Sequence, residues 1–90
     1  MVNLTVLDLS YNRLTSVDIL KNCSKLSILY LQGNQIKDTR TIEKIGPGLP
    51  NMVNLYLSEF NGKGANPCCG DKGYRNNVVQ AFKNLNSLDG

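Results

Sequence analysis

The chain has 90 residues, of which 41% are hydrophobic, and its ten lysines and arginines against seven acidic residues give a net charge of +3. This length allows one domain with a modest core, and no apolar run is long enough to span a membrane. The chain contains no histidine, so it lacks the commonest general base and a common metal ligand. We therefore expect a non-catalytic domain that needs no cofactor and no metal.

One sequence pattern recurs in the first half of the chain. Aliphatic residues and one asparagine repeat with the same spacing in two segments: Leu4, Leu7, Leu9, Asn12, Leu14 and then Leu26, Leu29, Leu31, Asn34, Ile36. A third copy begins at Met52 and continues with Leu55 and Leu57. The step of 22 residues from Leu4 to Leu26 is typical of a coil made from one short strand and one return segment. The pattern predicts about three stacked coils over residues 1–58.

Within each copy, the alternate leucines should point to the same side of a strand and fill the interior, as Leu7 and Leu9 do in the first. Asn12 and Asn34 follow at the turn out of the strand, where an amide side chain can bond backbone groups that would otherwise be buried unpaired. We expect either one to destabilise the fold when it is replaced by alanine.

The return segment of the second coil carries signals for a short helix. Asp38 or Thr39 can cap its beginning. Pro47, Gly48 and Pro50 then end it before the third strand.

The period breaks after the third copy, so residues 59–90 are expected to form an insertion loop followed by a cap. Glu59 to Gly73 is rich in glycine, asparagine and lysine, which predicts a loop. Apolar residues then recur at helical spacing, which predicts an amphipathic helix from Tyr74 to Lys83. This helix would cover the last coil, as the terminal unit of a repeat array must. All 90 residues would form a single domain.

The three cysteines are Cys23, Cys68 and Cys69. An odd number with two adjacent members argues against a disulfide framework and favours free thiols in an intracellular protein that is not secreted. Cys23 is expected to pack as a small hydrophobic residue. Zinc binding by the adjacent pair is the alternative, but the sequence contains no histidine and no second cysteine pair to complete four ligands.

The end of the chain carries a more specific signal. Tyr74-Arg75, Val78 and Leu88-Asp89-Gly90 resemble the carboxy-terminal cap of intracellular leucine-rich-repeat proteins of the short-period class. This class includes the acidic leucine-rich nuclear phosphoproteins, the spliceosomal A-prime protein, a phosphatase regulatory subunit and an axonemal dynein light chain.

The resemblance implies an α/β solenoid with a right-handed superhelical path, a parallel concave sheet, short convex helices and a helical cap. In that cap we expect the Asp89 carboxylate to accept backbone hydrogen bonds. The long acidic tail of the nuclear phosphoproteins is absent from this sequence, so functions that depend on that tail are not expected.

The outward side chains of the three strands should form columns on the concave face. The predicted columns are Val6, Ile28 and Asn54; Asp8, Tyr30 and Tyr56; and Ser10, Gln32 and Ser58, with Tyr11 beside the last. Tyrosine offers a large contact area at low entropic cost, so Tyr30 and Tyr56 are the predicted anchors for an unidentified protein partner. The alternative is that the two rings only stack on each other.

Two other functions are the alternatives to binding a protein on the concave face. Direct nucleic-acid binding is disfavoured because the cations and the aromatic residues belong to different faces. The other is a structural subunit of an axonemal, spliceosomal or phosphatase assembly. Such a subunit would dock through the open amino-terminal edge, because the chain begins almost inside its first repeat.

Overall fold

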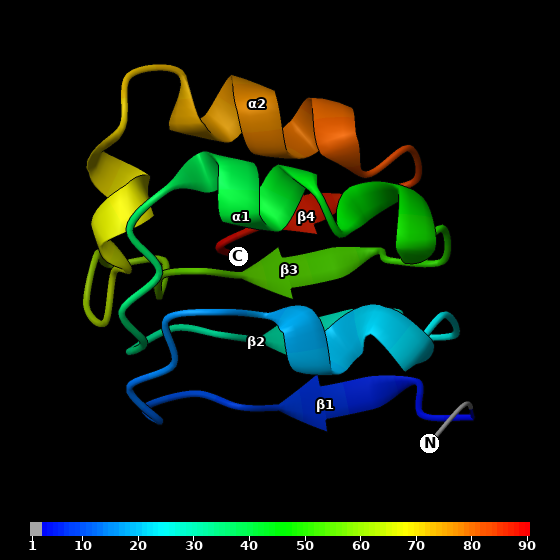
Figure 1. The fold of residues 1–90 in the computed structure, drawn as a ribbon. Coiled ribbons are helices and arrows are strands. Elements are labelled where there is room, and N and C mark those ends of the chain that lie inside the picture. The colour runs from blue at the N-terminus through cyan, green and yellow to red at the C-terminus, as the bar shows by residue number, and fades with distance from the viewer. Residues whose placement is uncertain (1–2) are drawn as a thin grey trace.

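The computed structural model describes residues 3–90 and has two layers, a parallel sheet and the return segments that cover one side of it (Figure 1). The four strands are β1 (Val6–Asp8), β2 (Ile28–Tyr30), β3 (Asn54–Tyr56) and β4 (Ser87–Leu88), and they pair in chain order. The central leucines are in register across the sheet, from Leu7 to Leu29 to Leu55 to Leu88. The predicted α/β solenoid is confirmed.

The return segments are short helices on the convex side: η1 (Asp18–Asn22), α1 (Thr39–Glu43), η2 (Gly46–Gly48), η3 (Pro67–Gly70) and α2 (Tyr74–Ala81). Asp38 is the cap of α1, since its side chain accepts a hydrogen bond from the Arg40 backbone N–H at 2.9 Å. Within residues 3–90, none of the helices is long and apolar enough to cross a membrane.

The carboxy-terminal part differs in detail from the sequence prediction. Helix α2 ends at Ala81, two residues early, because Phe82 leaves the helical conformation (φ −117°, ψ 100°) and its side chain enters the core. The expected loop contains the 3-10 turn η3, and Ser87 and Leu88 add a fourth strand to the sheet. The cap therefore covers the solenoid with both a helix and a strand.

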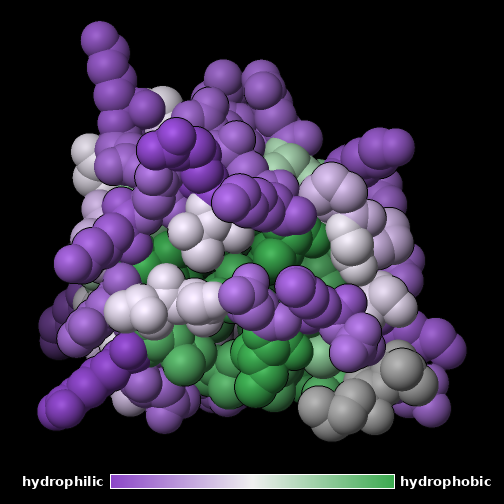
Figure 2. Space-filling model, viewed as in Figure 1, coloured by the Kyte–Doolittle hydropathy of each residue, from purple (hydrophilic) through white to green (hydrophobic). Residues whose placement is uncertain are grey.

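The core is complete in the second coil and open at the first. Leu26, Leu29 and Leu31 are fully buried, whereas their counterparts in the first coil are only partly buried. The reason is that no strand lies on the outer side of β1 among the described residues. Ile19 in η1 is 65% exposed, and Figure 2 shows hydrophobic atoms at the surface along β1 and η1. This edge is apolar.

Buried amides connect each coil to the next. Asn34 accepts hydrogen bonds from the backbone N–H groups of Asn12 (3.1 Å) and Leu14 (2.8 Å) in the preceding coil. Its amide nitrogen donates to the carbonyls of Leu9 and Leu31. One side chain therefore pairs four backbone groups that belong to two turns.

The prediction for Asn12 was wrong. Its side chain is exposed and only donates to the carbonyl of Ser10 at 3.2 Å. The role of Asn34 is instead repeated one coil later by Asn66, which accepts from the Ile36 N–H and donates to the carbonyls of Leu31 and Leu57. An amide acts as a link only where a preceding coil offers it backbone groups.

Asp89 takes the same place at the end of the array. One carboxylate oxygen accepts from the N–H groups of Leu57 (2.7 Å) and Ser58 (3.0 Å), and the other accepts from the Tyr74 hydroxyl (2.7 Å). Arg75 donates to the carbonyl of Leu88 at 3.2 Å. Together with buried Val78, these contacts hold the cap to the third coil.

Candidate functional site: the concave face

The concave face is the side of the sheet opposite the helices. Strand pairing places Val6, Ile28 and Asn54 in one row across the sheet. A second row contains Asp8, Tyr30 and Tyr56. The sheet register thus brings these predicted positions together.

Tyr30 and Tyr56 form a stacked pair with ring centroids 4.8 Å apart and planes inclined by 11°. Both side chains are half-buried. The stacking that was weighed as an alternative is therefore present. It leaves part of each ring open to a partner and gives the face a rigid aromatic centre.

Asp8 stands at the end of the tyrosine row and is exposed. The Ser10 hydroxyl (2.6 Å) and backbone N–H (3.0 Å) both donate to its Oδ1. These bonds, that of the hydroxyl first, lower the pKa of Asp8 below its ordinary value. The carboxylate is thus ionised at neutral pH.

The third predicted row is less accessible. The Ser58 side chain is buried and donates to the Glu59 carbonyl, so it offers a partner little surface. Gln32 is half-buried, and among the described residues its Oε1 is a buried side-chain atom without a hydrogen-bond partner. Only Ser10 and part of Gln32 remain at the surface.

Tyr11 holds the insertion loop. Its hydroxyl donates to the Glu59 carboxylate, which raises the pKa of Tyr11. The ring lies against Gly33 (φ +79°), where an added Cβ would come within 2.2 Å of it, and the Gly33 N–H donates to the Gly64 carbonyl. Tyr11 thus ties the loop to the first two coils, and its hydroxyl is engaged within the chain.

The loop presents an aromatic residue that the sequence analysis did not single out. Phe60 is 88% exposed, and its Cβ would lie 3.2 Å from a Cβ built on Gly90. Tyr56 is close to the same glycine. The only sequence signal was an aromatic residue within an otherwise polar, glycine-rich loop. Phe60 therefore extends the apolar part of the concave face beyond Tyr56.

The cysteines lie away from this face. Cys23 and Cys68 are buried, and Cys69 is partly exposed in η3. A hydrogen bond donated by the free Cys68 thiol to the Cys69 sulfur lowers the pKa of Cys69 against the opposing effect of burial. Across residues 3–90 no three His, Cys, Asp or Glu side chains gather in a way that could hold a metal ion.

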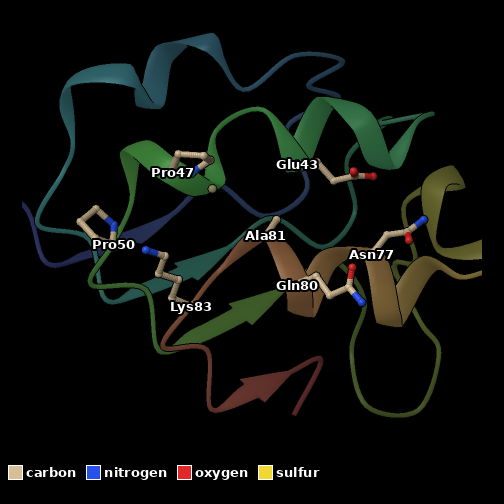
Figure 3. A pocket seen from close by; sticks show the side chains of 8 residues that line it. Glu43, Pro47, Pro50, Asn77, Gln80, Ala81 and Lys83 are labelled. Atoms are coloured by element: carbon tan, nitrogen blue, oxygen red, sulfur yellow. The ribbon is translucent and has the colours of Figure 1, made fainter.

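A groove of about 440 Å³ lies on the convex side, between the segment containing η2 and helix α2 (Figure 3). Pro47, Pro50 and Ala81 line its apolar part, and Glu43 and Lys83 come from its two walls. The sequence analysis did not predict this groove. It is separated from the tyrosine row by the sheet and the core.

Stacked coils, an in-register parallel sheet and linking amides define a leucine-rich-repeat solenoid. The family pattern described as leucine-rich repeats in two copies matches residues 2–44. Residues 2–44 of the chain therefore consist of leucine-rich repeats.

Relatives agree with this assignment. Leucine-rich repeat-containing protein 51 of Bos taurus is 36% identical over 88 residues, which cover 97% of this chain and 42% of the relative. Cilia- and flagella-associated protein 410 of Homo sapiens is 34% identical over 91 residues, covering 99% of this chain and 33% of the relative. The chain thus spans less than half the length of these relatives.

A solved structure shares the fold. The structure of Chaetomium Mex67:Mtr2 subunits matches with a TM-score of 0.80 at 22% identity, over 96% of this chain and 54% of the other. At this identity the match supports the architecture alone.

Proposed function

We propose that the chain is a non-catalytic protein-binding module that holds a segment of a partner protein on its concave face. The apolar contacts are Tyr30, Tyr56 and Phe60, and Val6 and Ile28 border them. The exposed Phe60 beside the tyrosine stack carries this proposal, since exposed aromatic side chains on a rigid support are typical anchors of protein interfaces.

We place the protein inside the cell, where its three cysteines stay reduced. A cilium is one such compartment, because one relative is named for its association with cilia and flagella. The partner is a protein rather than a nucleic acid, because no lysine or arginine occupies the three rows of the concave face.

The double variant Tyr30→Ala/Tyr56→Ala is expected to lose partner capture from a native lysate while the circular dichroism spectrum stays near that of the wild type. The stack contributes only about 0.5 to 1.5 kcal/mol beyond area burial, so the fold should tolerate its loss. Phe60→Ala should weaken capture of the same partner. Val79→Ala is the matched control, since Val79 is an exposed apolar residue on α2. Undiminished capture by the double variant would contradict the proposal.

The apolar first coil favours a second function, a structural subunit that docks through this edge into an axonemal, spliceosomal or phosphatase assembly. In that case the purified chain should self-associate as its concentration rises in sedimentation velocity experiments, because within residues 3–90 no strand pairs with the outer edge of β1. Ile19→Ser should then reduce the association. A chain that remains monomeric at all concentrations would contradict this function.

A further inference from the structure

The two faces of the Tyr30 ring have different neighbours. Tyr56 on β3 covers one face. Strand β1 lies on the opposite side of β2, and its residue in register with Tyr30 is Asp8. The second face of the ring is therefore turned toward a short carboxylate side chain instead of a third ring.

The space beside this face matches one planar group. Neighbouring strands are about 4.7 to 4.9 Å apart, and the Tyr30 and Tyr56 centroids keep this separation, at 4.8 Å. A tyrosine at position 8 would continue the stack, but the aspartate reaches only part of the way from the sheet. The result is a slot with an aromatic wall, formed by Tyr30, and a carboxylate at its base, formed by Asp8.

The Asp8 carboxylate has one oxygen available to a cation. Ser10 donates both of its hydrogen bonds to Oδ1 of Asp8, and within residues 3–90 no hydrogen bond reaches Oδ2. Val6, which is 49% exposed, precedes Asp8 on the same face of β1 and offers an apolar surface beside the slot.

The charges around the slot also favour a cationic ligand. The chain as a whole carries a net charge of +3. No lysine or arginine occupies the rows of the concave face, and the row itself contains the Asp8 carboxylate. A second carboxylate, that of Glu59 in the loop after β3, accepts a hydrogen bond from Tyr11 beside this face. The concave face thus complements a basic ligand.

We propose that this slot binds an arginine side chain of the partner, whose guanidinium stacks on the free face of Tyr30 and donates to Oδ2 of Asp8. A guanidinium is planar, stacks on aromatic rings and pairs with carboxylates in a fixed geometry, whereas an ammonium group offers no plane. The arginine methylenes would cross Val6. The assignment rests on the proposed function, in that the arginine belongs to the segment held on the concave face.

The test uses N-acetyl-arginine amide as a probe and N-acetyl-lysine amide as the matched comparison. Each is titrated at low salt into ¹⁵N-labelled protein, and the Tyr30 ring protons and the Asp8 amide are followed by NMR. We expect saturable shifts at both positions with the arginine probe and binding at least about fivefold weaker with the lysine probe. Asp8→Asn should weaken arginine binding by a similar factor, about fivefold or more. Asp18→Asn, which removes an exposed carboxylate from η1, should leave it unchanged.

Equal affinity for the two probes, or arginine binding that is unaffected by Asp8→Asn, would overturn the slot. An absence of shifts at Tyr30 would do the same. The capture experiment separates this result from the proposed function. If the arginine probe does not bind but capture still depends on Tyr30 and Tyr56, the concave face binds the partner without an arginine anchor. If the arginine probe binds but the Tyr30→Ala/Tyr56→Ala variant captures the partner as well as the wild type does, the proposed function is refuted.

Discussion

Asn66→Ala is expected to lower the free energy of unfolding by about 3 to 5 kcal/mol, because it removes three buried hydrogen bonds and leaves one backbone N–H without a partner. The unpaired group is the N–H of Ile36, whereas the Leu31 carbonyl keeps its bond from Asn34 and the Leu57 carbonyl keeps its bond from the Asn66 backbone N–H. A domain of this size has a total stability of only about 5 to 13 kcal/mol. Urea unfolding followed by circular dichroism measures the loss.

Asn12→Ala is the matched control, because Asn12 has the same place in the repeat but an exposed side chain with one local hydrogen bond. Its effect should stay within about 0.5 kcal/mol of zero. Equal losses for the two variants would show that the amides contribute through the local turn and do not link coils.

Gly46→Ala is expected to destabilise the chain by about 2 to 3 kcal/mol, because an added Cβ would overlap rigid backbone. A Cβ at this position would lie 2.2 Å from the carbonyl oxygen of Ala81 and 2.9 Å from its carbonyl carbon. The close approach lets η2 pack on the end of α2, beside the convex groove (Figure 3). Thermal unfolding of the variant should show a clearly lower midpoint.

Gly48→Ala tests the same substitution two residues later in η2. Apart from its neighbours in the chain, no described residue has a heavy atom within 4 Å of a Cβ built on Gly48. The alanine also restricts the unfolded chain, so the variant should be neutral or up to about 1 kcal/mol more stable. Similar destabilisation by both alanines would point to helix geometry instead of a steric clash.

The leucine spacing was sufficient to predict the first three strands, their register and the two rows that they carry across the concave face. Side chains alternate along a strand, and the constant step between copies brings Leu7, Leu29 and Leu55 into line. The same reasoning correctly paired Asp8 with Tyr30 and Tyr30 with Tyr56. These features depend on periodicity, which is present in the sequence itself.

The errors arose where a role depends on a neighbouring coil. In the first two copies an asparagine follows five residues after the central leucine, at positions 12 and 34. The corresponding position in the third copy is Phe60, because the insertion displaces the asparagine to position 66. The repeat pattern therefore did not identify Asn66 as the residue that links the second and third coils. It also did not identify Phe60, the exposed aromatic residue at the position where the asparagine was expected.

Asn12 shows the opposite error. It occupies the expected position of the repeat, but among the described residues no preceding coil offers backbone groups to its side chain. Likewise, periodicity placed Ser58 on the concave face without revealing that the backbone turn after β3 buries it beside Asp89. Such effects depend on contacts between distant segments, which a local pattern does not contain.

The linking side chains also set the order in which the turns can be completed while the chain is synthesised. The turn of the first coil is paired by Asn34, that of the second by Asn66 and that of the third by Asp89. Each turn is therefore satisfied only by a residue that the ribosome adds later. A nascent chain that stops before residue 89 would leave the N–H groups of Leu57 and Ser58 without their carboxylate partner, so the third coil would stay incomplete until Asp89 had left the ribosome.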